Sequence, residues 1–159
     1  MVCFQKDNRP SYNGAMDFEA LKKRLNSSFR YLQSNRMRVT ELEAGYAKVE
    51  MDIDEQITNI HGFVHGGALF SLADTAAGSA AFTTGRDAVT LTGTINFVRP
   101  GTGGRLISIA NEIEAGRTIG TYEVFIFNEH DDLLCRGTFT MFFLDKEHKE
   151  RNRANERSE

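Results

Sequence analysis

At 159 residues, with 40% hydrophobic and 26% charged residues, the chain has the size and composition of one globular domain with a sizeable core. A net charge of -3 gives no signal for binding a polyanion, and two cysteines, Cys3 and Cys135, are too few for the disulfide framework of a small secreted protein. No apolar run approaches the roughly 20 residues that cross a bilayer, and residues 1–10 lack a secretory pattern. We therefore expect a cytoplasmic protein that binds neither nucleic acid nor membrane.

The composition changes twice along the chain and predicts three segments. Residues 1–16 are polar and interrupted by Pro10 and Gly14, so we expect a flexible N-terminal segment. Residues 17–145 carry the periodic apolar patterns and form a single domain. Residues 146–159 are almost all charged or polar and predict a disordered tail.

The domain opens with a helical pattern. From Asp17, a suitable N-cap, apolar residues recur at helical spacing and predict one amphipathic helix of about four turns. The apolar positions are Phe18, Leu21, Leu25, Phe29 and Leu32. We expect the basic residues between them to form a solvated face.

Strand patterns then surround a second helix. Residues 37–44 and 46–54 predict two strands joined at Gly45, and four further strands follow over 88–99, 105–115, 117–128 and 133–144. Between these two groups, a helix is predicted from near Gly66 to before Gly85.

Consecutive strands pair antiparallel, so the element order predicts an α+β fold rather than a doubly wound sheet. The second helix consists largely of alanine, glycine and serine. Small side chains let a helix lie close to a sheet that curves around it.

One carboxylate, Asp74, stands in this apolar helix. Burying an ionised group costs on the order of several kcal/mol unless something compensates it. Asp74 is therefore either a structural residue, held by Thr75, a nearby arginine or a backbone N–H, or a reactive one. The pair Gly66-Gly67 at the helix start either presents free N–H groups to an oxyanion or only permits a tight turn.

The spacing of polar residues around this helix resembles that of the hotdog-fold thioesterases, and within them the phenylacetate-type branch. Asn59, the run His65-Gly66-Gly67 and Asp74 stand at the family's spacing, and residues 96–100 (Asn-Phe-Val-Arg-Pro) are similar to its downstream strand end. The resemblance implies a hotdog fold, in which a curved antiparallel six-stranded sheet wraps around a long central helix. It also implies a homodimer with active sites at the subunit interface, often assembled into a homotetramer.

The implied reaction is hydrolysis of an acyl-coenzyme A thioester to free acid and coenzyme A (CoA), with no metal or other cofactor. The resemblance makes Asp74 the general base or the nucleophile. It makes the Gly67 N–H, with Gly66 as the neighbouring candidate, the oxyanion hole. Asn59 and His65 would position the thioester carbonyl or the water, although a histidine at a helix start is often only a cap.

Thr92 falls where relatives hold the attacking water, although threonine also suits any strand. Arg99 and Arg117 are weak candidates for binding the CoA phosphates, as are the basic residues within 149–153. The side chains expected to line the acyl pocket are Phe63, Leu69, Phe70 and Phe82. His61 and His65 lack an evident third ligand for zinc.

A hotdog protein that binds acyl-CoA without hydrolysing it, as in transcriptional regulators, is the alternative from another class. Such regulators carry a DNA-binding helix-turn-helix before the hotdog and tend to lose the catalytic carboxylate. Here one amphipathic helix precedes the first strand, and Asp74 is present. A hydratase on the same fold would use another Asp/His arrangement, which is not found. A hotdog without activity stays open.

Overall fold

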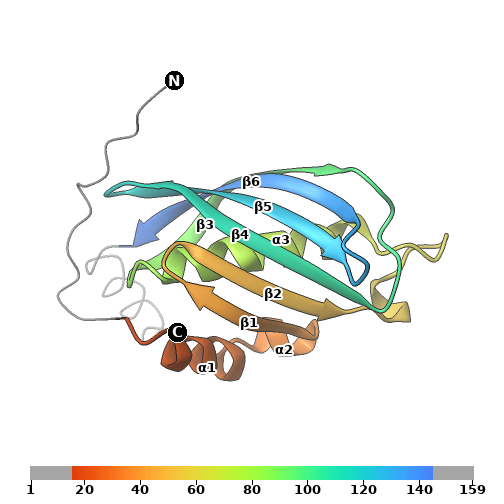
Figure 1. Cartoon of the computed structure of the whole chain (residues 1–159), viewed down its shortest axis with the longest axis horizontal. Helices are drawn as coiled ribbons and strands as arrows, with labels where there is room; N and C mark the ends of the chain where they lie inside the picture. The colour runs from red at the N-terminus through yellow and green to blue at the C-terminus, as the bar shows by residue number, and fades with distance from the viewer. Residues whose placement is uncertain (1–15, 145–159) are drawn as a thin grey trace, which may run out of the picture.

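The structure is a computed structural model that describes residues 16–144, so the expectations for the two terminal segments lie largely outside the described residues. One antiparallel sheet of six strands curves around the central helix α3 (Gly66–Phe82), which confirms the predicted hotdog fold (Figure 1). The strand order is β1-β2-β4-β5-β6-β3. The strands are β1 (Met37–Glu43), β2 (Tyr46–Asp52), β3 (Asp87–Phe97), β4 (Arg105–Ala115), β5 (Ile119–Asn128) and β6 (Leu133–Leu144).

The strand patterns predicted these boundaries to within about two residues. The sheet curves because extra residues interrupt the pairing. Register shifts occur in the β1–β2, β3–β6, β4–β5 and β5–β6 pairs. Such bulges bend a strand and increase its twist.

Helix α3 packs on the inner face of the sheet through its small residues. Ala73, Ala76, Ala77 and Ala80 are all fully buried. They meet alternate residues of the strands, because every second side chain of a strand points inward. The inward-facing and fully buried residues include Ala47, Val49, Leu106, Ala110 and Ile126. The lack of bulk on this helix face lets the helix and the sheet approach closely, as expected.

The predicted four-turn N-terminal helix is wrong in one respect, since it is broken at Phe29. Helix α1 (Phe18–Ser28) begins at Asp17, whose side chain accepts from the Ala20 N–H as expected of an N-cap. Phe29 is extended (φ -92°, ψ 96°), and helix α2 (Arg30–Ser34) restarts after it. The three residues before the break, Asn-Ser-Ser, compete with the helix through their own side chains.

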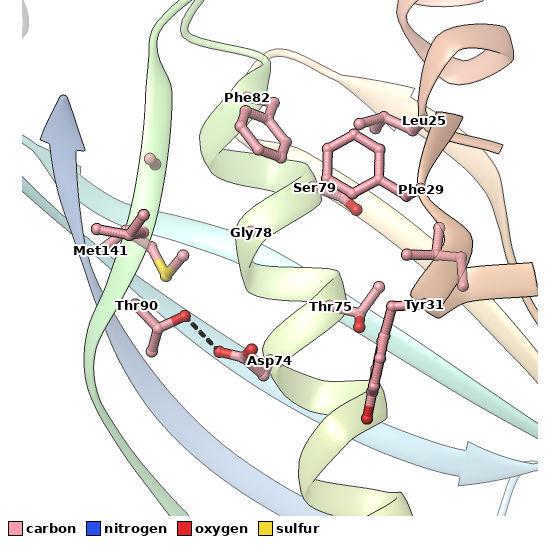
Figure 2. A pocket seen from close by; sticks show the side chains of 13 residues that line it. Leu25, Phe29, Tyr31, Asp74, Thr75, Gly78, Ser79, Phe82, Thr90 and Met141 are labelled. Atoms are coloured by element: carbon pink, nitrogen blue, oxygen red, sulfur yellow. Dashed lines mark hydrogen bonds between the residues drawn. The ribbon is translucent and has the colours of Figure 1, made fainter. Parts of the chain in front are cut away.

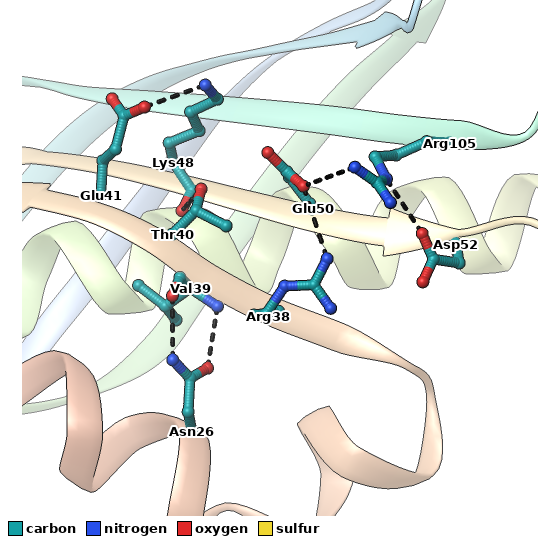
Figure 3. A network of polar contacts seen from close by, with 9 residues as sticks. All are labelled: Asn26, Arg38, Val39, Thr40, Glu41, Lys48, Glu50, Asp52 and Arg105. Atoms are coloured by element: carbon teal, nitrogen blue, oxygen red, sulfur yellow. Dashed lines mark hydrogen bonds and ion pairs between the residues drawn. The ribbon is translucent and has the colours of Figure 1, made fainter.

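Asn26, near the end of α1, forms a tertiary contact. Its carboxamide donates to the Val39 C=O and accepts from the Val39 N–H, both at 2.9 Å, and thereby ties α1 to the edge strand β1 (Figure 3). Gln33 then donates to the carbonyls of Asn26 and Ser27 that the broken helix leaves free. The carbonyl groups exposed by the break therefore have hydrogen-bond partners, and the break determines the position of Phe29.

The solvent face of β1, β2 and β4 carries ion pairs. Arg105 bridges Glu50 at 3.4 Å and Asp52 at 2.9 Å, and Arg38 approaches Glu50 at 3.6 Å (Figure 3). This is the wet face that the alternation of residues 46–54 predicted.

After β2 the chain passes through the short 3-10 helix η1 (Glu55–Ile57) and a loop to the start of α3. Within the part of the chain that the structure describes, no helix is long and apolar enough to span a bilayer.

Candidate active site

Asp74 lies in the middle of α3, on the side that faces β3. The Thr90 hydroxyl donates to Asp74 Oδ1 at 2.6 Å (Figure 2). Asp74 is half-buried, not enclosed among alanines as expected, and within residues 16–144 it forms no ion pair. Of the structural partners that the sequence suggested, none holds this carboxylate. Its second oxygen therefore remains available to a ligand.

Asp74 and Thr90 stand at one end of a largely apolar cavity of about 190 Å³. The cavity runs between α3, the broken junction of α1 and α2, and the first half of β3. Its apolar walls include Leu25, Phe29, Phe82 and Met141 (Figure 2). It is smaller than the ~300 Å³ of a typical ligand pocket, so it suits an acyl group better than a whole CoA ester.

The start of α3 presents one free N–H. His65 is the N-cap, and its Nδ1 accepts from the Gly67 N–H at 2.9 Å, so a neutral ring carries its proton on Nε2. The Gly66 N–H makes no hydrogen bond with any residue from 16 to 144. In this structure, then, Gly66 and not Gly67 has the unpaired N–H that the sequence predicted at this helix start.

The loop before α3 is organised by Asn59. Its side-chain oxygen accepts from the His61 N–H at 2.9 Å and from the Phe63 N–H at 3.2 Å. These two bonds leave the amide nitrogen of Asn59 as its remaining donor. A second, open hollow lies here, with Asn59, Gly66, Phe97 and Arg99 in its walls.

The other predicted residues divide between the two hollows. Phe82 lines the cavity beside Asp74, whereas Phe63 and Leu69 line the hollow beside Gly66. Phe70 lines neither and packs on Phe139, with the ring centroids 5.3 Å apart. Of the four residues predicted to line an acyl pocket, Phe82 alone lines the cavity beside Asp74.

Of the two arginines, Arg99 lies in the wall of the hollow beside Gly66. Arg117 lies at the β4–β5 turn, where its carbonyl accepts from Arg86, and lines neither hollow. Thr92 is exposed on β3, and a register shift separates it from Thr90. No group of three potential metal ligands occurs between residues 16 and 144.

Sequence reasoning missed Thr90 and the α1–α2 junction. Thr90 and Thr92 have the same parity in one strand pattern, so alternation alone could not select the one that reaches Asp74. The sequence did not indicate that Phe29 and Tyr31 line the cavity, because the apolar spacing continues through the helix break.

Gly66 and Asp74 cannot act on one carbonyl within a single protomer. They are eight residues apart on the same helix, which is about 12 Å along its axis. The chain therefore carries two separate polar centres on α3, a carboxylate beside an apolar cavity and an N–H donor beside an open hollow.

Comparison with known proteins gives the same family. A family model described as "Thioesterase superfamily" matches residues 61–135. A putative esterase of Archaeoglobus fulgidus is 30% identical over 111 residues, which cover 69% of this chain and 72% of that protein.

The acyl-coenzyme A thioesterase PaaI of Escherichia coli is 37% identical over 92 residues, or 57% of this chain and 66% of PaaI, just under two thirds of its length. The solved PaaI structure superposes with a TM-score of 0.76 at 28% identity, over 80% of this chain and 93% of that one.

A hypothetical thioesterase of Streptococcus pneumoniae, solved with coenzyme A, superposes with a TM-score of 0.65 at 30% identity over 68% of this chain and 85% of that one. Fold, motif spacing and these likenesses agree, and the chain therefore belongs to the thioesterase superfamily as a PaaI-like hotdog thioesterase.

Proposed function

We propose that this protein hydrolyses an acyl-CoA thioester to free acid and CoA, with Asp74 as general base or nucleophile. The observation that carries the proposal is a half-buried carboxylate at the end of an apolar cavity, held by the Thr90 hydroxyl and, among residues 16–144, by no cation. An oriented, unneutralised carboxylate can take a proton from water or attack the thioester carbon itself. The PaaI likeness and the CoA-bound relative support this substrate class.

The Gly66 N–H is the proposed oxyanion donor. It is unpaired, it belongs to the first residue of α3, and the helix dipole favours negative charge at that end. The His65 ring fixes the turn by accepting from Gly67, and the Asn59 amide is a second donor beside the same hollow.

A working site requires a second protomer, because one helix cannot bring Asp74 and Gly66 together. The strand β3 is an edge of the sheet, and Val89, Leu91 and Phe97 on it are 47%, 61% and 54% exposed. A long, exposed edge of this kind is a template for pairing with another strand. In the proposed homodimer, two copies pair through β3, and the Asp74 cavity of each faces the Gly66 hollow of the other. A tetramer would be a further step.

Arg99 lies beside the Gly66 hollow and is proposed to approach the CoA phosphates. Its side chain is 57% exposed, and its ion pair with Asp132 is long, at 3.8 Å. A long, exposed ion pair is weak, so Arg99 can exchange it for a ligand.

The test is hydrolysis of a panel of acyl-CoA esters by the wild type and by Asp74→Asn. We expect kcat to fall by at least ~10²-fold in the variant, the scale of a lost acid–base group. Asp17→Asn is the matched control, since asparagine also caps a helix and Asp17 lies in neither hollow. Undiminished turnover in Asp74→Asn would refute the role. Tight binding of esters without turnover in the wild type would instead favour the non-catalytic alternative.

Co-expression tests the shared site. Asp74→Asn and a Gly66→Pro variant, which lacks the donor, are each expected to be inactive. In a symmetric dimer with shared sites, random mixing leaves one intact site in half of the dimers, or roughly a quarter of wild-type activity. No recovery in the mixed dimers would refute a site that combines Asp74 of one protomer with Gly66 of the other.

A further inference from the structure

Ser79 is a buried hydroxyl in the acyl cavity for which the fold supplies no partner. The residue is only 4% exposed, lines the cavity, and forms no side-chain hydrogen bond with any residue from 16 to 144. The next two hydroxyls along the chain behave differently, since the C-cap Thr83 and the following Thr84 donate to the carbonyls of Ala80 and Ala81. Within residues 16–144 the fully enclosed hydroxyls without a partner are those of Ser108 and Tyr122, whereas Ser79 Oγ is open to the cavity and is therefore available to a ligand there.

Ser79 lies at the end of the cavity opposite Asp74. It follows Asp74 by five residues, or about 7.5 Å along the helix axis, the span of one substituted aromatic ring or a short chain. Beyond it, the rings of Phe29 and Phe82 pack against each other, with their centroids 5.9 Å apart, and form the wall of the cavity there (Figure 2). A long unbranched acyl chain does not fit this depth.

Gly78 opens the space between the two ends. It lies one turn after Asp74 and one turn before Phe82, and the absence of a side chain there leaves the wall of the cavity flat.

We propose that Ser79 determines acyl specificity by hydrogen bonding to a polar group at the distal end of a compact acyl group. This inference rests on the proposed thioesterase function and names the kind of acyl group that the same site takes. The thioester carbonyl lies at Asp74, the body of the acyl group passes Gly78, and a hydroxyl or similar group meets Ser79. Esters without that group leave Ser79 unpaired and are poorer substrates.

The experiment compares two matched ester pairs, benzoyl-CoA with 4-hydroxybenzoyl-CoA and hexanoyl-CoA with 6-hydroxyhexanoyl-CoA. For at least one pair, we expect the wild type to prefer the hydroxylated ester by about tenfold or more in kcat/KM. In Ser79→Ala this ratio falls at least about fivefold. In Ser108→Ala it is unchanged, because Ser108 is also a buried serine without a partner but lies on β4, outside the cavity. A wild-type ratio near one, or an equal ratio in Ser79→Ala, overturns the proposal.

Binding separates a failure of this proposal from a failure of the proposed hydrolysis. If the wild type turns over none of the esters, their dissociation constants are measured by calorimetry on Asp74→Asn, with and without Ser79→Ala. A preference for the hydroxylated ester that disappears with Ser79→Ala supports the subsite even without catalysis. Equal affinities within each pair, or no binding of any ester, overturn it.

Discussion

The Thr90 hydroxyl donates a hydrogen bond of 2.6 Å to Asp74 Oδ1 and so links the edge strand β3 directly to the carboxylate of α3. The bond orients one oxygen of Asp74 and leaves the other facing the cavity. It also makes the geometry of the carboxylate depend on β3, the strand through which a second protomer is proposed to pair.

Thr90→Val therefore tests whether the orientation of Asp74 matters to the reaction. Valine keeps the shape of the side chain and removes the donor. Hydrogen bonds to charged groups contribute about 1.5–3 kcal/mol, so we expect kcat to fall roughly tenfold or more with little change in KM. Steady-state kinetics with one good acyl-CoA ester measures this.

Two comparisons make the Thr90 result specific. Thr90→Ser retains the donor and is expected to recover most of kcat. Thr92→Val removes the hydroxyl that the family resemblance made a candidate for holding the attacking water, and a larger loss there than at Thr90 would transfer that role to Thr92.

Gly66→Pro tests the oxyanion donor by removing a single N–H. Proline is well tolerated at the first position of a helix, and the residue before it must be extended, as His65 is (φ -62°, ψ 136°). The variant should fold, with kcat reduced by about 10²–10³-fold, the usual cost of a lost oxyanion donor.

Gly66→Ala is the control for bulk at this position. A Cβ there would lie 3.3 Å from the Phe97 ring, which is 54% exposed and can move, while the N–H is kept. Activity in Gly66→Ala well above that of Gly66→Pro is expected. If the two variants lose activity equally, contact with Phe97 and not the N–H is responsible.

The sequence predicted the fold well because its strongest signals are local. Alternation along the strands and the turn at Gly45 (φ 73°) follow from side-chain periodicity and backbone sterics alone. The break at Phe29 could not be predicted in the same way. The apolar spacing runs straight through it, and the hydrogen bonds that stabilise the break join Asn26 to Val39, a residue of another element.

The site was predictable as a set of residue types and not as a set of contacts. The spacing of Asn59, His65 and Asp74 identified the residues, but the capture of the Gly67 N–H by His65 depends on one side-chain rotamer. The choice between Thr90 and Thr92 depends on a bulge in β3, which the alternation of the sequence does not reveal.

Gly78→Ala separates stability from activity at the cavity wall. Glycine in a helix interior is less favourable than alanine by about 1 kcal/mol, and a Cβ there would meet Met141 Cε at an ordinary 3.6 Å. We expect the melting temperature to rise by about 2–4 °C and kcat/KM to fall for aromatic esters more than for acetyl-CoA. A more stable variant with unchanged selectivity would mean that the acyl group does not pass Gly78.

Glu129 is expected to make the stability of the fold depend on pH, through the loop that forms the wall of the Gly66 hollow. Its carboxylate accepts from the Gly104 N–H at 2.7 Å and the Arg105 N–H at 3.2 Å, and these bonds lower the pKa of Glu129 from 4.5 to about 2. The bonds fix the end of the loop that carries Arg99 and Gly101 past this hollow. Because the pKa is lower in the folded state, this stabilisation is present above pH 4.5 and is lost as the pH falls toward 2.

Glu129→Gln should therefore lower the melting temperature at pH 7, and the difference from the wild type should shrink as the pH falls below 4.5. Thermal unfolding followed from pH 7 to pH 3 measures it. Glu19→Gln, which removes an exposed carboxylate on α1 that pairs with Lys22, is the control and should show a small difference at every pH. A Glu129→Gln difference that stays constant across this range would show that the side chain acts through its shape and not through its charge.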